Sequence, residues 1–210
     1  MNALKPVLSK PWIWSWLAAL ATFAATALFT GGASAFGLSQ ATLTFAAFSV
    51  MVGLGQMLVI TLGPGNVDLS VPATITLSGT LALKFMETEG SLVLPGLLIA
   101  IGIGFAVGAA NYALIKLLRI PPIIATLSMS FLVQSLAIWS NRGLRIKPPE
   151  ALAAFTTGTT FGVPNIALAG LALSVVIWWL LERSIYGRWI SAIGQSPFAA
   201  RMAGIPVDGT

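Results

Sequence analysis

Long apolar runs restrict most strongly what this chain can fold into. Apolar residues make up 57% of its 210 residues, charged residues only 8%, and its mean hydropathy is +0.91. A soluble domain carries about 25% charged residues. Crossing a bilayer takes a helix of ~20 apolar residues, and the chain has room for about six. The runs therefore predict an all-α, polytopic membrane protein: a bundle of about six transmembrane helices.

Short polar or glycine- and proline-rich segments separate the expected spans. We place these spans at about residues 12–30, 40–62, 69–86, 91–115, 121–140 and 164–182. Residues 1–182 then form the transmembrane region, and residues 183–210 form a polar, basic cytoplasmic loop. The first run has the charged start of a signal peptide, but it exceeds the ~7–15 apolar residues of such peptides. We expect it to be retained as a helix.

Basic residues lie singly at the ends of the runs, which is typical of topology determinants. If the N-terminus is inside, seven of them are cytoplasmic: Lys5, Lys10, Lys116, Arg119, Arg183, Arg188 and Arg201. Four are then outside: Lys84, Arg142, Arg145 and Lys147. This excess predicts that both termini are inside (N-in/C-in). The scattered charges also argue against a nucleic-acid partner, although the net charge is +5.

The chain lacks the side chains that most enzyme sites need. It contains no cysteine and no histidine, and none of its six acidic residues pairs with another inside an expected span. It also lacks the G-x-x-x-x-G-K-[ST] loop that binds nucleotide phosphates. We therefore expect no catalytic residues, no metal site and no cofactor, and any ATP hydrolysis would belong to a separate subunit.

A polar break, Leu62–Ser70, separates the second and third runs. Non-helical backbone at membrane depth survives only where it is buried in protein or lines water. An ionisable residue such as Asp68 is a candidate functional group there. The alternative, which we favour, is that its carboxylate caps the start of the third span through an Asx-type interaction. The topology places the break near the cytoplasmic side.

Two further spans carry rows of residues at helical spacing. In the fourth span, Gly96, Ala100, Gly104 and Gly108 recur every four residues. Small residues at this spacing allow helices to approach closely, so we expect packing within the subunit, with a ligand lining as the alternative. In the fifth span, Thr126, Ser130 and Gln134 form a polar stripe. The stripe indicates either interhelical hydrogen bonding or a pathway wall.

The C-terminal segment contains the signals of one short helix. Ser196 suits the N-cap and Pro197 the first helical position. Gly204 suits the left-handed position after the helix, and Pro206 prevents its continuation. The helix is too short to bind a lipid surface strongly by itself, so its apolar face predicts a protein contact. That face holds Phe198, Met202 and Ile205.

Three blocks of this sequence resemble permease subunits of ribose-type ABC importers. Gly55–Ile60 with Val67–Val71 resembles their GMTLVI…GIDLSVG signature, Ile124–Met129 is similar to their FIATL segment, and Tyr186–Gly194 with Ala199–Ile205 resembles their GRYIYALGGN…AARLSGI loop. The resemblance covers about residues 39–208. Here the signature turn is about two residues longer, and Pro72 stands where glycine is usual. Family members also continue for several more spans after this loop.

The resemblance implies a partial, type II ABC importer-like permease in the bacterial inner membrane. It would translocate a sugar or a similar small polar solute. Its partners would be an ATP-binding cassette subunit, an identical or different second permease subunit, a periplasmic solute-binding protein and membrane lipid. The implied ATPase-coupling residues are Gly194, Ser196, Pro197, Ala199, Ala200, Arg201 and Gly204. The implied signature or pathway residues are Gln56, Asn66, Asp68, Ser70, Thr126, Ser130 and Gln134.

Two other functions remain open from the residues alone. An ion-coupled secondary transporter or channel would use Asp68 as its ion site and the glycine-proline break as a discontinuous helix. A non-transporting fragment with a role in assembly or regulation is the third possibility.

Overall fold

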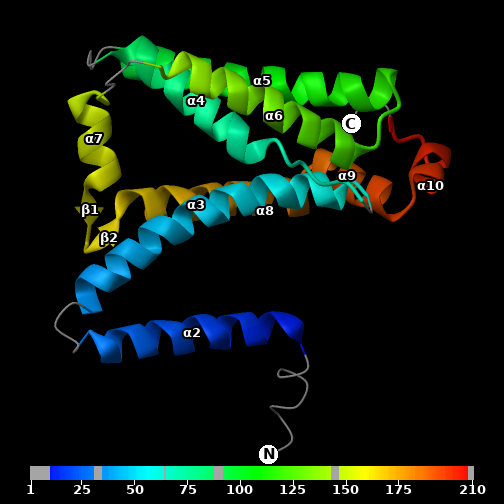
Figure 1. The fold of residues 1–210 in the computed structure, drawn as a ribbon. Coiled ribbons are helices and arrows are strands. Elements are labelled where there is room, and N and C mark those ends of the chain that lie inside the picture. The colour runs from blue at the N-terminus through cyan, green and yellow to red at the C-terminus, as the bar shows by residue number, and fades with distance from the viewer. Residues whose placement is uncertain (1–9, 31–34, 64, 88–91, 143–146, 208–210) are drawn as a thin grey trace, which may run out of the picture. The chain divides into compact units, whose positions relative to one another are not determined.

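The computed structural model describes residues 10–30, 35–63, 65–87, 92–142 and 147–207 (Figure 1). In these ranges the regular elements are helices and one short hairpin. The elements in chain order are α2 (Pro11–Phe29), α3 (Ala35–Thr61), α4 (Val71–Met86), α5 (Val93–Leu117), α6 (Pro122–Ser140), α7 (Glu150–Thr157), β1 (Thr159–Thr160), β2 (Val163–Pro164), α8 (Asn165–Arg183), α9 (Ile185–Gln195) and α10 (Pro197–Met202).

Six apolar helices lie where the sequence has its six apolar runs, so the prediction of a helical bundle is confirmed. Four of them, α3, α5, α6 and α8, are long and apolar enough to cross a membrane, and α2 and α4 are shorter apolar helices. The largest difference from the expected bounds is at α3, which begins at Ala35 rather than residue 40; every other bound lies within two residues of the one expected. The sequence reasoning did not predict α7, the hairpin or α9.

The chain divides into two compact units, residues 1–45 and 46–210. The first unit holds α2 and the start of α3, which enclose a pocket of about 310 Å³. Three threonines in its wall, Thr22, Thr26 and Thr42, each donate a hydrogen bond of 2.8–2.9 Å to the carbonyl four residues earlier. Their hydroxyl protons are therefore already bonded within their own helices.

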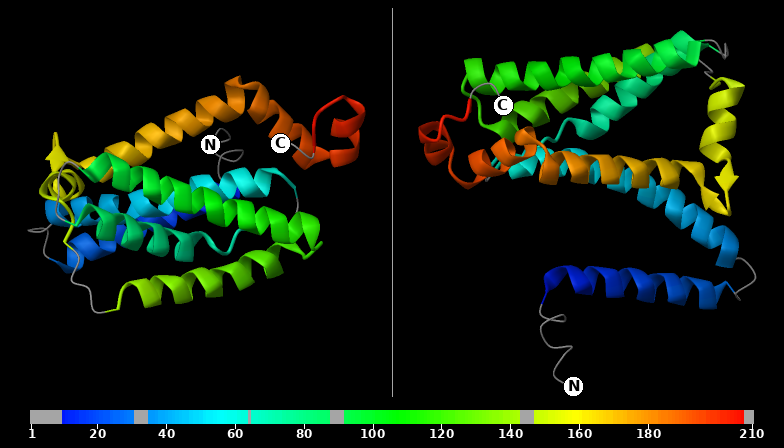
Figure 2. Two further views of the ribbon diagram at one scale, coloured as in Figure 1. Left: turned by 90° about the horizontal axis from the view of Figure 1, so that it is seen from above. Right: turned by 180° about the vertical axis from the view of Figure 1, so that it is seen from behind.

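In the second unit, α4 packs against both α5 and α6 (Figures 1 and 2). Ala73 and Leu77 of α4 are buried against Val133 and Ala137 of α6. Half-buried side chains of α5, among them Val107, complete this core. The helices carry small residues at these contacts, and small residues let helix backbones approach closely.

The glycines of α5 have two different environments. A Cβ on Gly96 would overlap the side chain of Met86, whose sulfur would lie only 3.2 Å away. Gly96 therefore has the packing role that we expected for the whole row. A Cβ on Gly104 or Gly108 would meet nothing within 4 Å. Gly104 and Gly108 therefore make no such contact with the described residues, and the packing expected for them stays a prediction.

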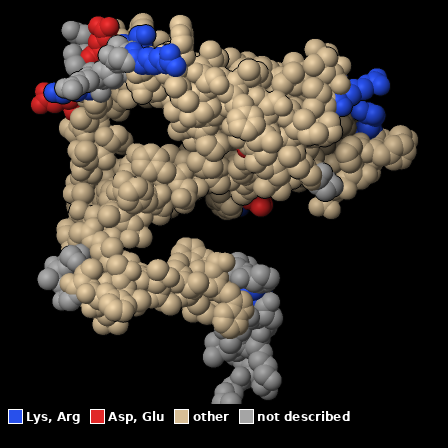
Figure 3. Space-filling model, in the orientation of Figure 1, with Lys and Arg blue, Asp and Glu red and all other residues tan. Residues whose placement is uncertain are grey.

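Charged side chains of the second unit gather at the ends of its helices, and the stretch between them is almost free of charge (Figure 3). Lys84 and Arg142 lie at one end of α4 and α6, whereas Lys116 closes the other end of α5. This distribution is typical of helices whose middle parts face lipid.

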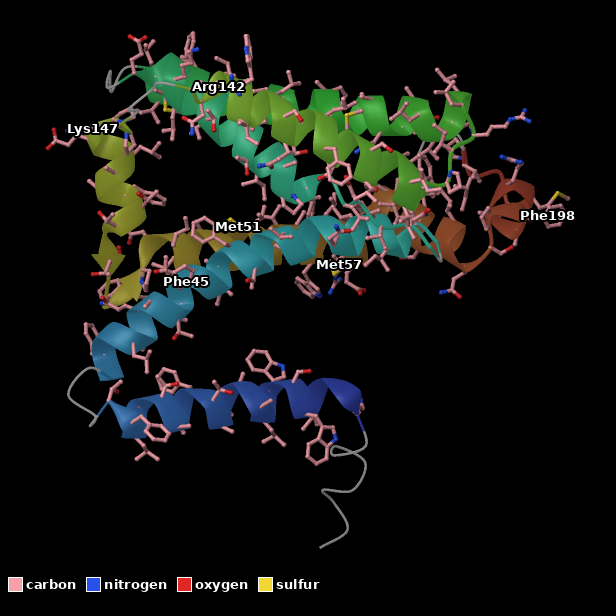
Figure 4. The ribbon with its side chains drawn as sticks, viewed as in Figure 1. Phe45, Met51, Met57, Arg142, Lys147 and Phe198 are labelled. Carbon is pink, nitrogen blue, oxygen red and sulfur yellow. The ribbon has the colours of Figure 1, made fainter. Side chains whose placement is uncertain are left out.

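Helix α3 contacts both α8 and α9. Gly170 of α8 is buried, and its Cβ position lies 3.6–3.7 Å from the side chains of Met51 and Ala47 on α3 (Figure 4). Beyond α8 the chain turns at Ser184, whose hydroxyl accepts a hydrogen bond from Gly187 N at 3.0 Å. Gly187 leaves no room for a side chain, because a Cβ there would overlap the backbone of Leu181. This turn positions α9 and α10.

Candidate functional site

The α3–α4 connection, residues 62–70, is bonded by side chains of residues that are distant in the sequence. Gln56, in the last turns of α3, binds the backbone of Asp68 twice. Its Nε2 donates to the carbonyl oxygen of Asp68, and its Oε1 accepts from Asp68 N at 3.2 Å. One amide therefore satisfies both backbone groups of a residue that lies outside any helix, as a low-polarity environment requires.

Thr126 of α6 satisfies the residues on either side of Asp68. Its hydroxyl oxygen accepts from Leu69 N at 3.1 Å and lies within donating distance of the Val67 carbonyl at 3.2 Å. The side chain is buried, with 3% of its surface exposed. Thr126 therefore joins α6 to the connection by hydrogen bonds.

Asp68 leads a chain of hydrogen bonds into the protein. Its Oδ1 accepts from Ser70 N at 2.8 Å and from Ser70 Oγ at 2.6 Å. Ser70 Oγ in turn accepts from Nδ2 of Asn111, on α5, at 2.9 Å. Ser70 and Asn111 are buried, with 1% and 5% of their surfaces exposed. The carboxylate thus joins the start of α4 to α5.

This geometry changes the role expected for Asp68. The N-cap of α4 is Ser70, not Asp68. Asp68 forms an Asx turn with Ser70 N, and no hydrogen bond runs from its carboxylate to a backbone N–H inside the helix within the described residues. The interaction is of the predicted Asx type, but it fixes the residue that precedes the helix instead of capping the helix directly.

Two pockets border this network, and Asp68 lies in the wall of both. The larger, of about 350 Å³, is lined by Val59, Leu62, Asn66, Val67, Asp68, Gly108, Asn111, Tyr112, Ile115, Pro122 and Thr126. The smaller, of about 160 Å³, is lined by Asp68, Ser70, Val71, Thr74, Ile75, Gly104, Val107 and Gly108. The space that Gly104 and Gly108 leave open therefore belongs to these pockets.

The sequence reasoning missed Asn111. Its Oδ1 is a buried acceptor without a hydrogen-bond partner in the part of the chain that the structure describes. A signal was present, because Asn111 is the only amide side chain in the apolar α5 sequence, and polar residues inside a membrane segment are candidate functional residues.

The remaining predicted pathway residues take less part in the network. Asn66 is half-buried and lines the larger pocket. Ser130 is half-buried, and Gln134 is exposed. Neither Ser130 nor Gln134 lines either pocket. The polar stripe of α6 therefore contributes only Thr126 to this site.

The predicted C-terminal helix is present as α10. Ser196 Oγ accepts from Ala199 N at 3.2 Å, and Pro197 is the first helical residue. At the other end, Ile205 N donates to Ala200 O and Gly204 N donates to Arg201 O, both at 3.0 Å. With φ of +81° at Gly204, this is a Schellman motif. The predicted caps are confirmed at both ends.

The residues proposed for coupling divide into an exposed and an inner group. Pro197, Ala199, Arg201 and Gly204 are exposed, Ser196 is half-buried, and Ala200 is buried with 3% exposure. Phe198 and Met202 are each 76% exposed, and Phe198 points away from the neighbouring helices (Figure 4). Gly194 contacts α3 instead, because a Cβ there would overlap the carbonyl group of Thr61. Contact with a partner is thus open to the exposed group only.

Comparison with known proteins agrees with these observations. The family described as "Branched-chain amino acid transport system / permease component" matches residues 38–210. The autoinducer 2 import system permease protein of Enterobacter sp. is 31% identical over 77% of this chain and 46% of its own length. The L-arabinose ABC transporter permease protein of Azospirillum brasilense is 32% identical over 74% and 45%.

The ribose import permease protein of Escherichia coli is 26% identical over 76% of this chain and 50% of its own length. The chain thus spans about half the length of the curated relatives that it matches, and no solved structure matches it. The relatives are permeases of sugar and related ABC importers, which confirms the resemblance seen in the sequence. The chain is a multi-pass membrane protein and belongs to the permease-component family of ABC transport systems.

Proposed function

We propose that this chain forms part of the permease subunit of an ABC importer that carries a sugar or a similar small polar solute across the bacterial inner membrane. Residues 1–182 form its membrane region in the N-in/C-in orientation, and residues 183–210 form its cytoplasmic coupling loop. The observation that carries the proposal is α10, a short helix capped at both ends that presents exposed Phe198 and Met202. Exposed apolar side chains on a small rigid element suit a protein partner.

The partner at α10 is an ATP-binding cassette subunit, because the chain itself lacks a nucleotide-binding loop. A solute-binding protein delivers the substrate on the opposite side, and a second permease subunit, identical or different, completes the pathway. The named relatives import autoinducer 2, L-arabinose and ribose. These names support a small, hydroxyl-rich substrate.

The contacts of the second unit offer a route from α10 to the candidate site. Helix α10 packs against α9, and Gly194 near the end of α9 contacts the Thr61 carbonyl at the end of α3. A displacement of α10 is therefore passed to the residues just before the α3–α4 connection. Gln56 and Thr126 bond that connection, so a displacement that reaches it would change their hydrogen bonds to Asp68 and Leu69.

The energy source provides the first test. We expect uptake of labelled D-ribose, L-arabinose or D-fructose by cells that carry this chain together with its cognate ATP-binding and solute-binding proteins. Arsenate, which depletes ATP, should abolish uptake, and a protonophore applied while ATP is maintained should not. Uptake that follows the proton gradient and is lost in Asp68→Asn would instead establish the ion-coupled alternative.

The coupling surface provides the second test. Phe198→Ala and Arg201→Glu should lower sugar uptake while the ATP-binding subunit continues to hydrolyse ATP, because both side chains are exposed on α10. Gly204→Val should act in the same direction, since φ of +81° is unfavourable for valine. Glu182→Lys reverses an exposed charge at the end of α8, outside the coupling loop, and is the matched control. Unchanged uptake in all three α10 variants would refute the docking role.

A further inference from the structure

The larger pocket beside the α3–α4 connection has the composition of a small-molecule site. Its volume of about 350 Å³ falls within the ~300–1,000 Å³ of ligand pockets, which combine apolar walls with a few polar groups. Val59, Leu62 and Ile115 supply apolar surface, and Tyr112 adds an aromatic ring. Because a Cβ on Gly108 would meet nothing within 4 Å, the α5 wall is open at that position.

Two residues of the pocket wall, Asp68 and Asn111, carry an acceptor with unused capacity. Asn111 Oδ1 is buried and has no partner among the described residues, although Nδ2 of the same amide is bonded to Ser70 Oγ. The amide orientation is set by that bond, because the Ser70 hydroxyl already donates its proton to Asp68. The hydrogen bonds made to the Asp68 carboxylate within the described residues go to Oδ1, which leaves Oδ2 able to accept.

An unpaired buried acceptor is costly, and a donor that arrives with a ligand removes that cost. Asn111 lies in the pocket wall, so a solute that occupies the pocket and displaces the neighbouring side chains can bring a donor to its buried Oδ1. Both available acceptors call for hydroxyl or N–H donors, and the remaining wall is mostly apolar. A ring with several hydroxyl groups and apolar C–H faces meets both requirements.

We propose that this pocket binds one neutral, polyhydroxylated solute, with Asn111 and Asp68 accepting hydrogen bonds from its hydroxyl groups and Gly108 providing the space. The proposal rests on the proposed function, which supplies the substrate class, and adds the place where the permease holds it. It assigns Asp68 a contact with substrate in addition to its structural bond to Ser70.

The absence of cysteine allows a direct test, because one introduced thiol is then the only one in the chain. In membrane vesicles that contain the full chain, Gly108→Cys places a thiol in the pocket without a clash. A small methanethiosulfonate reagent should label it, and D-ribose, L-arabinose or D-fructose should slow the labelling. At ten times the half-protecting concentration, labelling should slow about tenfold.

Gly102→Cys is the matched control, since Gly102 lies on the same helix, is exposed, and lines neither pocket. Sugars should leave its labelling unchanged. Equal labelling of Gly108→Cys with and without every sugar would overturn the proposal, and so would protection by sodium or potassium salts in place of sugars. Uptake without protection would refute the pocket and leave the importer standing. Protection by sugars without ATP-driven uptake would refute the importer and leave the sugar-binding pocket standing.

Two variants at Asn111 distinguish a hydrogen bond accepted from the sugar from the structural hydrogen bond that Asn111 donates to Ser70. Asn111→Leu and Asn111→Asp, each made in the Gly108→Cys chain, both lose the donor to Ser70, but only aspartate keeps an acceptor. Asn111→Leu should raise the half-protecting sugar concentration roughly three- to tenfold, the effect of one hydrogen bond. Asn111→Asp should change the half-protecting sugar concentration less than Asn111→Leu does. Equal shifts in both variants would show that Asn111 only supports Ser70.

Discussion

The α3–α4 connection and the α9–α10 segment both interrupt regular helix, but they satisfy their backbone groups in different ways. In the segment, Ser184 and Ser196 bond N–H groups three residues away, and the Schellman motif closes within six residues. In the connection, the partners lie 12 residues away for Gln56 and 57–59 residues away for Thr126. The segment is therefore held locally, whereas the connection depends on tertiary structure. Four substitutions test this contrast.

The largest effect is expected for Gln56→Leu. It leaves Asp68 N–H and the Asp68 carbonyl without partners, and each unmet buried group costs about 1–3 kcal/mol. We expect a loss of about 2–4 kcal/mol in the free energy of unfolding, since the site is half-buried. Denaturation in mixed detergent micelles measures it. Gln134→Leu, at an exposed position on α6, should change stability by less than about 0.5 kcal/mol. Equal effects would mean that the connection does not depend on Gln56.

Gly194→Ala comes next, because it tests a contact between the locally held segment and α3. A Cβ there would overlap the Thr61 carbonyl, which is backbone and cannot rotate away. Overpacking of this kind costs about 1–3 kcal/mol. Gly104→Ala is the matched control: it meets nothing within 4 Å and should be neutral or stabilising. A stable Gly194→Ala chain with normal uptake would remove this contact from the coupling route.

Thr126→Val should cost about 1–2 kcal/mol, because Leu69 N–H loses its acceptor while the side-chain shape is kept. Thr157→Val is the control, since Thr157 makes only a bond to the carbonyl four residues earlier on an exposed helix. Thermal midpoints in detergent compare the two. If both variants lose stability equally, the tertiary bonds of Thr126 contribute nothing.

The smallest effect is expected for Ser196→Ala. Loss of an N-cap costs about 1 kcal/mol, and α10 lies at the surface, so its fraying need not unfold the bundle. Amide hydrogen exchange should therefore accelerate in α10 while α4 to α6 keep their protection. Ser191→Ala, at an exposed position on α9, should leave both unchanged. A global loss of protection would show that the segment is not independently held.

The same contrast explains what the sequence could predict. The caps of α10 were predictable because each one is a fixed local spacing around Ser196, Pro197 and Gly204. The six apolar helices were predictable because run length alone decides them. The start of α3 was not, since residues 35–39 are as compatible with helix as with a loop.

The candidate site was only partly predictable. The resemblance pointed to Gln56, Asp68, Ser70 and Thr126, but no spacing rule pairs residues that meet through packing of separate helices. Asn111 was missed for the same reason, and Gly108 was assigned to packing because a row of small residues does not say which members face a neighbour.

The Thr126 hydroxyl has one further consequence. It carries a single proton, yet three carbonyls lie within its reach: Pro122 O at 2.9 Å and Ile123 O at 3.4 Å in its own helix, and Val67 O at 3.2 Å in the connection. If α6 were separated from the connection, the Thr126 hydroxyl would still have Pro122 O as an acceptor within its own helix. Only Leu69 N–H and Val67 O would then need a new partner, and water entering the adjoining pocket can supply it. Separating α6 from the α3–α4 connection at this point would therefore cost roughly the free energy of one hydrogen bond.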